Sequence, residues 1–476
     1  MRSKPPLLPR STPAVAGVSS RSIAALLDRL QAQSVECHSL MVVRHGHVIA
    51  EGWWAPYSPE RPHLLYSLTK SFTAIAVGLA VTDGLLSLDD RVVDVLPDHV
   101  PSGVSEQGRR ITVHHLLSMT AGHATDSLDA AWRLEPGDLT KGFLGVPFTE
   151  SEGTRHVYDN ATTYVLARMV ERVADRSLPD LLDERLFQPM GIDHAEWDRV
   201  ASGAAFGFHG LHLKTEAVAA FGQLLLSEGA WRGQQLIPVD WVRLATSRHV
   251  ETLQSAGDPL DADSSSGYGY GFWMSREGYR GEGAFEQLCM VYPEHDLLVT
   301  VTAGDGPHGA TVGAIRDCLL PGVGNPASAC DDDDLAERLQ GLSFAPVPGS
   351  ADPSRSATAK IDASAGGSAL PAATSVIIEP VDGGWHLRLG PSIEVAVGHG
   401  DWRESSPLGR PVLAAGAWQE DTFVADLYPI TTPHRVRLLV HAGEGTAVAT
   451  WSTVPLTSPS LEVHLRAPLM TRPDVA

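Results

Sequence analysis

LLYSLTKSFTAI, residues 64–75, places Ser67 three positions before Lys70 at the start of an apolar run that stops at Gly84. This pattern predicts that Ser67 lies in the first turn of a buried helix, with Lys70 one turn later on the same face. Burial would desolvate the lysine amine, so that it could accept the hydroxyl proton of the serine. The helix N-terminus would add N–H groups and a positive dipole beside the serine oxygen. A core helix with a lysine that reaches toward solvent explains the same residues, and the stretch alone favours neither interpretation.

The bulk composition sets broad limits on function. The chain has 476 residues, of which 43% are hydrophobic and 20% are charged, enough for more than one domain with a large core. The formal net charge of −21 argues against nucleic acid and against an anionic membrane as partners, because both need a cationic surface. The same charge would also serve plain solubility, so it says nothing about a substrate.

Cysteines and the N-terminal residues bear on the compartment. The four cysteines lie far apart without a C-x-x-C pair, which fits neither a disulfide framework nor a zinc site. Residues 1–20 read as a Pro- and Ser-rich tail without the apolar segment of a secretory signal. No run of about 18 apolar residues marks a transmembrane helix. We therefore expect a cytoplasmic protein, and the sequence leaves its oligomeric state open.

Residues 21–322 are predicted to form an α+β domain. A helical period over 20–33 precedes two apolar runs, 40–43 and 47–50, which are typical of a β-hairpin. Helices dominate the middle of the segment, and a strand-rich block follows. Because strands stand near both ends, we expect the two ends to close one antiparallel sheet. The later strands are predicted at 270–275, 279–283, 287–292 and 297–303.

The remaining chain is predicted to contain a linker and a second domain. Residues 323–374 read as a linker with a short helix at 335–339, because 349–374 are rich in Ser, Ala, Gly and Pro. Residues 375–476 contain short apolar runs between turn signals, which predicts a separate all-β domain without a catalytic constellation. Its strands are predicted at 375–378, 385–389, 393–397, 422–427, 435–440 and 447–451.

A second candidate element is Tyr158-Asp159-Asn160, between an irregular stretch over 123–157 and a predicted helix over 161–174. A cation beside Tyr158 would favour its phenolate and let it relay protons. The amide of Asn160 could hold a lysine or a substrate carbonyl. By themselves these residues are better explained as a plain helix start, with Asp159 or Asn160 as the N-cap.

A third candidate is the Gly-rich strand Arg280-Gly281-Glu282-Gly283-Ala284. Two glycines weaken a strand unless another backbone must approach it closely. A strand that offers N–H groups to a substrate carbonyl would need such an approach. A bulged edge strand explains the same pattern as well.

Taken in order, S-x-x-K at 67–70, Y-x-N at 158–160 and the Gly-rich strand at 281–284 resemble the serine β-lactamase and penicillin-binding-protein superfamily. The resemblance is to the branch that holds class C β-lactamases, D-aminopeptidases, family VIII carboxylesterases and nylon-oligomer hydrolases. It covers roughly residues 20–320. It implies a β-lactamase-like fold, in which an antiparallel sheet is flanked by helices and joined by a helical subdomain.

The resemblance also implies a role for each matching residue. Ser67 would be the acylated nucleophile, and Lys70 would be the base that assists it. Tyr158 would pass a proton to the leaving group and activate the deacylating water, while Asn160 would orient Lys70 and the substrate. The oxyanion hole would consist of the backbone N–H groups of Ser67 and Ala284.

The third motif departs from the family. Gly281 stands where relatives usually have Lys or His, and Glu282 stands in place of a hydroxyl residue, before the usual glycine at Gly283. In β-lactamases the basic residue helps to hold the substrate carboxylate. The loss of this basic residue, with an acid added, favours neutral or cationic esters and amides as substrates. The resemblance also implies that Glu282 and Gly283 lie on the substrate side of the site. Lys214-Thr215-Glu216 looks similar to the missing motif, but it opens a helix and lacks the glycine.

Other chemistries are disfavoured. The closest histidine pairs, His114-His115 and His209/His212, lack the H-E-x-x-H spacing, so no metal is predicted, and there is no G-x-S-x-G elbow. We predict a serine hydrolase that cleaves a small-molecule ester or amide through a Ser67 acyl-enzyme, without cofactor. The alternatives are a β-lactamase or D-aminopeptidase/DD-peptidase and, from another class, a catalytically silent ligand-binding relative.

Overall fold

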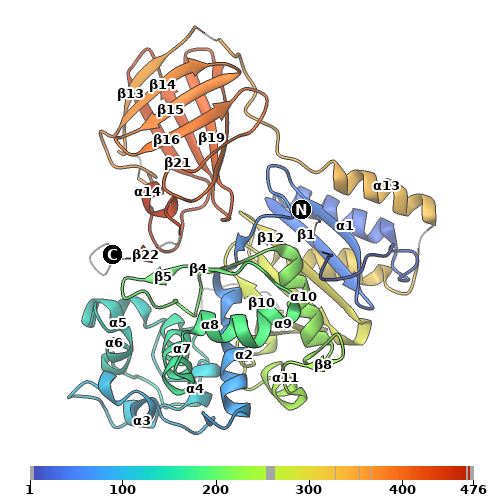
Figure 1. Cartoon of the computed structure of the whole chain (residues 1–476), viewed down its shortest axis with the longest axis vertical. Coiled ribbons are helices and arrows are strands. Elements are labelled where there is room, and N and C mark those ends of the chain that lie inside the picture. Colours follow the sequence, from blue (N-terminus) through green and yellow to red (C-terminus); the bar gives the residue numbers. More distant parts are fainter. Residues whose placement is uncertain are drawn as a thin grey trace.

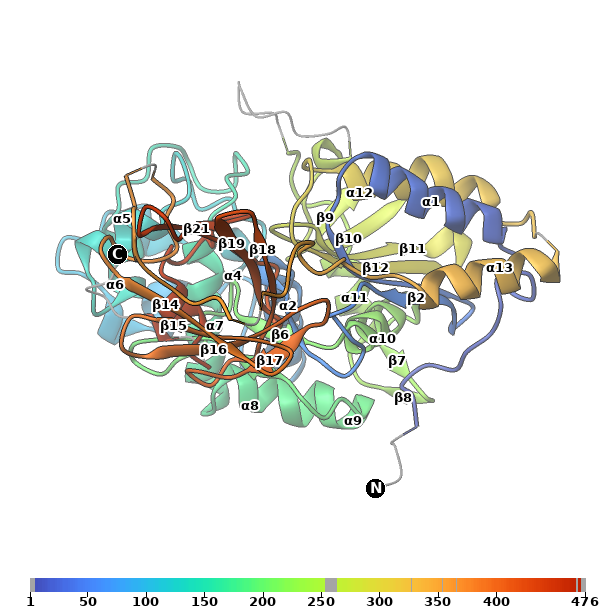
Figure 2. The same ribbon diagram turned by 90° about the horizontal axis from the view of Figure 1, so that it is seen from above.

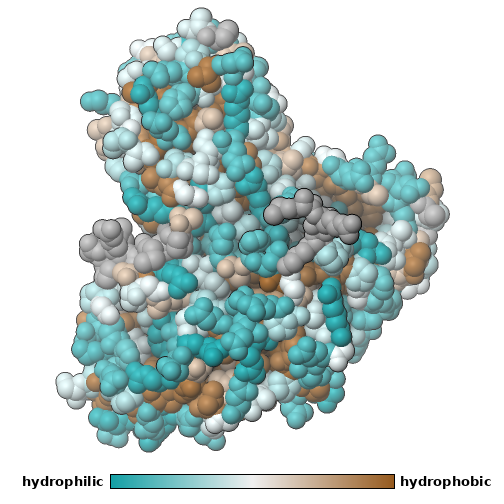
Figure 3. Space-filling model, in the orientation of Figure 1, coloured by the Kyte–Doolittle hydropathy of each residue, from teal (hydrophilic) through white to brown (hydrophobic). Residues whose placement is uncertain are grey.

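The computed structural model describes residues 5–252, 263–326, 328–352, 354–364, 366–467 and 470–471. An N-terminal α+β domain carries a C-terminal β-barrel that stands out from it (Figure 1). Seen from above, the barrel lies over the helical part of the N-terminal domain, with the sheet and helix α1 (Ser20–Ala32) beside it (Figure 2). The predicted α+β class with a C-terminal all-β domain is confirmed. On the face shown in Figure 3, hydrophilic residues cover most of both domains.

An antiparallel sheet forms the centre of the N-terminal domain. Within the described residues its strand order is β2-β1-β12-β11-β10-β9, so strands from both ends of the domain meet in it, as predicted. Two of the predicted strands, 287–292 and 297–303, coincide with β11 and β12. The strands are β1 (Cys37–Arg44), β2 (His47–Trp53), β9 (Trp273–Ser275), β10 (Gly278–Gly283), β11 (Gln287–Tyr292) and β12 (Leu297–Ala303).

Side chains that alternate along these strands fill two cores, one on each face of the sheet. On β1, Leu40 and Val42 face one core, whereas Met41 and Val43 face the other. The first core is covered by α1, α12 (Ala310–Ala314) and α13 (Ala329–Gln340). The second is covered by α2 (Thr69–Thr82) and α10 (Thr215–Leu226) together with the helical region, which is formed by the remaining helices between β3 and β9.

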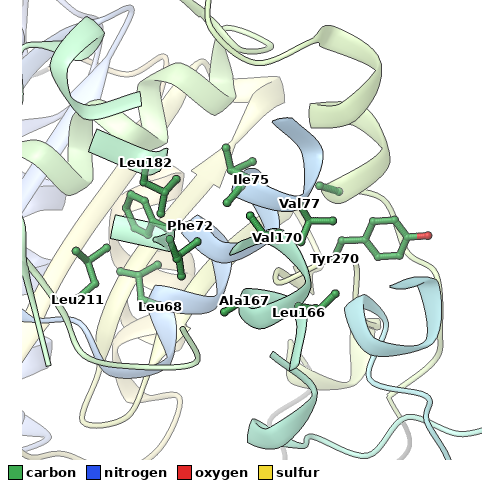
Figure 4. Packing of buried hydrophobic residues seen from close by; sticks show 14 of the residues in the cluster. Leu68, Phe72, Ile75, Val77, Leu166, Ala167, Val170, Leu182, Leu211 and Tyr270 are labelled. Carbon is green, nitrogen blue, oxygen red and sulfur yellow. The ribbon is translucent and has the colours of Figure 1, made fainter. Parts of the chain in front are cut away.

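Helix α2 is apolar on all sides and is buried accordingly. Every residue from Thr69 to Ala80 is buried. Its side chains Phe72 and Ile75, together with Leu68 just before the helix, pack against residues of α7 and α8, such as Val170 and Leu182 (Figure 4). The first turn of α2 is therefore fixed in the interior of the domain.

The helical region surrounds the outer end of α2. Residues 123–157, expected to be irregular, contain two short helices, α5 and α6. In the described part of the chain, short strands add three small sheets, including one in which β6 pairs with both β3 and β4. The elements are α3 (Val92–Val95), α4 (Val113–Leu117), α5 (Leu128–Leu134), α6 (Leu139–Gly145), α7 (Asn160–Ala174), α8 (Leu178–Leu182), α9 (Gln188–Met190), α11 (Val239–Ala245), β3 (His63–Leu64), β4 (Glu196–Trp197), β5 (Arg199–Val200), β6 (Leu211–Leu213), β7 (Ala230–Trp231), β8 (Gln234–Gln235) and β22 (Met470–Thr471).

The C-terminal domain is a closed barrel. Its strands follow the order β16-β15-β14-β13-β21-β20-β19-β18-β17, and a pairing between β16 and β18 closes it. Aromatic side chains such as Trp385 and Phe423 fill its interior. The elements are β13 (Ala357–Ile361), β14 (Ser375–Val381), β15 (Gly384–Leu389), β16 (Ile393–Gly398), β17 (Arg403–Ser405), β18 (Val412–Gln419), β19 (Thr422–Pro429), β20 (Val436–His441), β21 (Thr446–Trp451) and α14 (Leu461–His464).

Two segments contain more structure than expected. In the segment predicted as a tail, residues 9–11 lie beside β2, where the Ser11 N–H donates to the Val48 carbonyl over 2.9 Å. In the segment 323–374, predicted as a linker with a short helix, α13 packs against α1 and β2. The same segment supplies β13, which pairs with β14 and β21 in the barrel.

The loop after β19, residues 430–434, makes several contacts with the N-terminal domain. The backbone N–H of Leu64 donates to the carbonyl oxygen of Thr431 over 2.8 Å, and His212 Nδ1 lies 3.2 Å from the same oxygen. The Tyr57 hydroxyl donates to the carbonyl oxygen of Thr432 over 3.1 Å. Because Leu64 lies only three residues before Ser67, this loop reaches the strand that leads into the SxxK segment.

Candidate active site

Ser67 lies in a 3₁₀ turn, Tyr66–Leu68, that leads directly into α2. Two features hold this turn in place. The Leu65 N–H donates to the carbonyl oxygen of Leu211 in β6 over 2.9 Å, and Leu68 is buried in the core (Figure 4). Ser67 itself remains half-buried, so its hydroxyl is accessible at the N-terminus of a buried helix.

Lys70 is buried and its amine contacts three oxygen atoms. Nζ lies 2.9 Å from Ser67 Oγ, 2.6 Å from Asn160 Oδ1 and 3.1 Å from the carbonyl oxygen of Phe208. A neutral amine has two N–H donors and one lone pair. Its donors would satisfy the two carbonyl oxygens, and its lone pair would accept the hydrogen of the Ser67 hydroxyl. The surroundings of Lys70 thus suit a neutral amine.

The electrostatics agree with this arrangement. Burial lowers the pKa of Lys70 to about 7, although the negative charges of Asp126 and Asp159 act in the opposite direction. Near neutral pH a substantial share of Lys70 is therefore unprotonated and able to accept a proton.

Asn160 is oriented by a carboxylate that the sequence did not indicate. Its Nδ2 donates to Asp126 Oδ2 over 2.6 Å, and its backbone N–H donates to Asp126 Oδ1 over 3.1 Å. Since a carboxylate only accepts, the amide nitrogen must face Asp126 and the amide oxygen must face Lys70.

The local chain brings Asp126 to this position. Asp159 caps α7 by accepting from the Ala161 N–H over 2.9 Å, and it also accepts from the Ser127 hydroxyl over 2.7 Å. Desolvation and the nearby charge of Asp159 raise the pKa of Asp126 to about 6, although part of the Asp126 side chain stays exposed. The cap residue Asp159 and the orienting residue Asn160 thus have separate tasks.

Tyr158 completes the cluster around Ser67. Its side chain shares a hydrogen bond with Ser67, its ring centroid lies 4.7 Å from Lys70 Nζ, and it stacks on Trp273 at 5.5 Å. Desolvation raises the pKa of Tyr158, and the hydrogen bond to Ser67 only partly offsets this. The expectation that a neighbouring cation favours the phenolate is therefore wrong, because burial outweighs it, and Tyr158 is a neutral donor at neutral pH.

Strand β10 approaches the Ser67 turn closely at Gly283. A Cβ atom on Gly283 would lie 2.1 Å from the carbonyl oxygen of Leu65 and 3.0 Å from the backbone nitrogen of Ser67. Only glycine allows this approach. It places the end of β10, and Ala284 after it, beside the backbone of Ser67.

The residue before Ser67 and the residue after Ala284 both adopt left-handed backbone conformations. Tyr66, before Ser67, has φ 47°, and Phe285, after Ala284, has φ 63°. For bulky residues this conformation costs about 1–3 kcal/mol each, so surrounding contacts must hold it. Gln287 provides one such contact, because its Nε2 donates to the carbonyl oxygen of Phe285 over 2.6 Å.

Glu282 forms an ion pair with the completely buried Arg280, two residues earlier on the same strand face. Arg280 Nε donates to Glu282 Oε2 over 2.6 Å, and its other nitrogens contact Ser275 Oγ at 2.7 Å and Ser264 Oγ at 2.8 Å. Buried charge is tolerated when it is paired and hydrogen-bonded in this way. The acid that departs from the family is thus largely balanced, which weakens the argument that it attracts cationic substrates.

At Gly281, where relatives usually have a basic residue, neighbouring side chains fill the space that a side chain would need. A Cβ atom on Gly281 would lie 2.2 Å from Leu68 Cδ1 and 2.8 Å from Ser71 Oγ. Gly281 therefore faces the N-terminal turn of α2, on the opposite side of β10 from Glu282.

The structure brings together four predicted residues, Ser67, Lys70, Tyr158 and Asn160, from two sequence segments about ninety positions apart. A family model described as Beta-lactamase matches residues 23–316, more than half of the chain. The chain belongs to the beta-lactamase family. The matched part of this beta-lactamase-family chain contains all three motifs, and the predicted resemblance and fold are confirmed.

Named relatives of the beta-lactamase-family chain include hydrolases of different kinds. The 6-aminohexanoate-dimer hydrolase of Paenarthrobacter ureafaciens is 25% identical over 332 residues, which cover 64% of this chain and 84% of that protein. Lovastatin esterase of Penicillium rubens is 29% identical over 155 residues, which cover 28% of this chain and 39% of the esterase. At the level of the family, the chain is a hydrolase of the beta-lactamase fold.

A solved structure shares the fold beyond the N-terminal domain. The octameric penicillin-binding protein homologue from Pyrococcus abyssi has a TM-score of 0.50 and 14% identity, and the match covers 90% of this chain and 99% of that one. This likeness concerns the fold alone.

None of the helices within the described residues combines the length and apolar character needed to cross a membrane. Likewise, the described part of the chain has no group of three or more His, Cys, Asp or Glu side chains arranged to hold a metal ion.

Proposed function

We propose that the protein is a serine hydrolase that cleaves an ester or a small amide through an acyl-enzyme on Ser67. The observation that carries the proposal is the contact of Ser67 Oγ with the buried, easily deprotonated amine of Lys70 at 2.9 Å. A lysine of lowered pKa beside a serine hydroxyl is a nucleophile-and-base pair.

In acylation, Ser67 Oγ attacks the substrate carbonyl carbon while its proton passes to the neutral amine of Lys70. The N–H groups of Ser67 and Ala284 stabilise the negative oxygen that forms, at about 3–4 kcal/mol per donor. When the intermediate collapses, Tyr158 donates its hydroxyl proton to the leaving alkoxide or amine and recovers a proton from Lys70. Asn160, held by Asp126, keeps Lys70 in place through its amide oxygen.

In deacylation the same groups work in reverse. A water molecule attacks the acyl carbonyl and gives a proton to the Tyr158 and Lys70 pair, which has returned to its starting protonation state. The Ser67 oxygen leaves with a proton from that pair, and the carboxylic acid is released. No proton is gained or lost by the protein over the cycle.

Neutral esters and small amides are the proposed substrate class. The printed activities of the relatives, an amide hydrolase and an esterase, support it. So does the Gly-rich strand, because Gly281 is covered by Leu68 and the charge of Glu282 is balanced by Arg280. The wall beside Tyr158 is thus largely neutral and aromatic, with Trp273 and Tyr268 next to it.

Intact-mass analysis during turnover tests the proposal. The protein is mixed with p-nitrophenyl acetate, p-nitrophenyl butyrate, nitrocefin and a D-alanyl amide, quenched in acid and then mapped by peptide digestion. We expect an acyl adduct on the peptide containing Ser67 with the two esters and faster turnover of the esters than of nitrocefin. Preferred turnover of nitrocefin or of the D-alanyl amide would support the β-lactamase or peptidase alternatives. Absence of both adduct and turnover with all four compounds would support a silent binding protein.

The pH dependence of kcat/KM follows from Lys70. Its pKa of about 7 means that the amine is neutral above that pH and protonated below it, and only the neutral form accepts the serine proton. We expect kcat/KM for p-nitrophenyl butyrate to fall about tenfold per pH unit below pH 7 and to level off above it. Rates are measured between about pH 5.5 and 8.5 and corrected for spontaneous hydrolysis. A flat profile over this range would contradict Lys70 as the base.

Asp126→Asn provides a second test of the same base. The negative charge of Asp126 raises the pKa of Lys70, so its removal should shift the acid limb of kcat/KM to lower pH. Asp129→Asn is the matched control, since Asp129 is exposed in the neighbouring helix α5. Identical limbs in the wild type and Asp126→Asn would show that Asp126 exerts no electrostatic influence on the base.

A further inference from the structure

His434 is a buried residue of the barrel that contacts the side chains of Tyr66 and Phe285, the residues next to Ser67 and Ala284. It lies at the end of loop 430–434, just before β20, and is fully inaccessible to solvent. Its Nε2 is 2.6 Å from the hydroxyl of Tyr66, and its ring meets that of Phe285 edge-on at 5.0 Å. The rings of Tyr66 and Phe285 also contact each other, at 5.2 Å.

The hydrogen bonds define the tautomer of His434. Nδ1 lies 3.0 Å from the carbonyl oxygen of Thr453, which can only accept, so Nδ1 carries the hydrogen. Burial holds the pKa of His434 well below its ordinary value, so the ring is neutral. Nε2 therefore accepts from the Tyr66 hydroxyl. Tyr66 is thus tied by a directed hydrogen bond to the barrel.

The two aromatic partners of His434 adjoin the residues assigned to the oxyanion hole. Tyr66 directly precedes Ser67, and Phe285 directly follows Ala284; both have positive φ. The Ser67 N–H belongs to the peptide group between Tyr66 and Ser67, so a change in the position of the Tyr66 ring would rotate it directly. The Ala284 N–H lies one peptide group before Phe285, so a change at Phe285 would reach it through the backbone of Ala284.

We propose that His434 is a positioning residue, through which the C-terminal barrel sets the geometry of the oxyanion hole. The inference rests on the proposed function, because it presupposes that the N–H groups of Ser67 and Ala284 bind a developing oxyanion. His434 acts through Tyr66 and Phe285 and does not touch the substrate. The barrel is then a required part of the catalytic site rather than an appended module.

The rest of the loop explains how His434 can be rigid. The carbonyl oxygen of Thr431 accepts from the Leu64 N–H, and the Thr431 hydroxyl accepts from barrel residue Arg410 over 2.7 Å. Arg410 in turn pairs with the buried Asp198 of the N-terminal domain at 3.3 Å. At the other side, a Cβ atom on Gly304 would lie 2.5 Å from the carbonyl oxygen of Pro433, so β12 ends against the loop.

Kinetics of Tyr66→Phe, His434→Gln and His434→Ala with p-nitrophenyl butyrate test the inference. Tyr66→Phe removes one hydroxyl and keeps the packing of the ring, while His434→Gln keeps an acceptor. We expect kcat to fall roughly tenfold in Tyr66→Phe, less in His434→Gln and up to about 100-fold in His434→Ala, with KM little changed. The loss should appear in the single-turnover acylation rate.

Two controls separate positioning from barrel stability. Val395→Ala creates a cavity in the barrel core, where Val395 is fully buried, without touching the loop. His386→Ala removes a histidine from β15. Both should leave kcat unchanged while thermal unfolding reports the stability of each variant. If Val395→Ala lowers kcat as much as His434→Ala at similar loss of stability, the effect belongs to folding and the inference is wrong.

The remaining outcomes distinguish this inference from the proposed function. If the wild type forms the Ser67 adduct but Tyr66→Phe and His434→Ala keep full kcat, the positioning role is wrong and the hydrolase stands. If His434→Ala does not fold, unchanged kcat in Tyr66→Phe overturns the inference by itself. If the wild type forms no adduct, the proposed function fails and this inference fails with it.

Discussion

Ser67→Ala and Lys70→Met are each expected to lower kcat/KM for p-nitrophenyl butyrate by at least about 10³-fold, and the double variant should be no worse than either one alone. In the proposed mechanism Ser67 supplies the attacking oxygen and Lys70, 2.9 Å away, accepts its proton, so neither would work without the other. Residues that act as one unit show this kind of non-additivity. Methionine at 70 keeps the length of the buried side chain and removes its amine.

Initial rates for the three variants and the wild type provide the measurement, with Lys214→Met as the matched control. Lys214 begins the Lys-Thr-Glu sequence that looks similar to a family motif, but it precedes α10 and its Nζ lies 3.8 Å from Asp193. Lys214→Met should retain wild-type activity. If Lys70→Met kept more than about a tenth of the activity, another group would have to be the base.

Gly283→Ala is expected to lower kcat by about 100-fold while the protein stays folded. The added Cβ atom would lie 2.1 Å from the carbonyl oxygen of Leu65, far inside a normal contact, so β10 must retreat from the Ser67 turn. Retreat by about 1 Å would move the Ala284 N–H away from the oxyanion, and misplacement of that size costs about two orders of magnitude in rate.

Gly103→Ala serves as the control for this glycine. Gly103 is exposed, and a Cβ atom there would meet nothing within 4 Å. Its activity should match the wild type. Circular dichroism and thermal unfolding show whether Gly283→Ala is folded when it is assayed. Near-normal kcat in folded Gly283→Ala would argue against Ala284 as an oxyanion donor.

Much of the fold was predictable because the decisive segments carry strong local signals. Strands β11 and β12 are continuous apolar runs joined by Pro293-Glu294-His295-Asp296, a turn signal, and α2 is apolar on every side. In contrast, β18 reads VLAAGAWQ, whose alanines and glycine have little strand propensity. Its place in the barrel depends on β19 beside it, a tertiary contact that the sequence does not display.

The candidate site shows a similar division. Ser67, Lys70, Tyr158 and Asn160 carry motif spacing and could be named from sequence. Asp126 could not, because its position depends on hydrogen bonds between its neighbour Ser127 and the helix cap Asp159.

The ion pair between Arg280 and Glu282 could have been predicted from the sequence. Arg280 precedes Glu282 by two residues in a predicted strand, and side chains at i and i+2 share one face. Pairing with Glu282 could have been anticipated on that ground. His434 could not, since it lies in another domain, 368 residues after Tyr66.

The packing around Gly281 has a consequence for how this chain could acquire a different specificity. A lysine introduced there alone would have to displace Leu68, which is buried directly after Ser67 in the chain, and the Ser71 hydroxyl, which donates to the Gly271 carbonyl over 2.7 Å. Introduction of a basic residue at this position therefore requires prior shortening of Leu68, a change that is itself costly in a packed core. Shortening Leu68 or introducing lysine at position 281 would each lower the stability of the fold when made alone. A mutational path toward carboxylate-bearing substrates therefore passes through a less stable single variant.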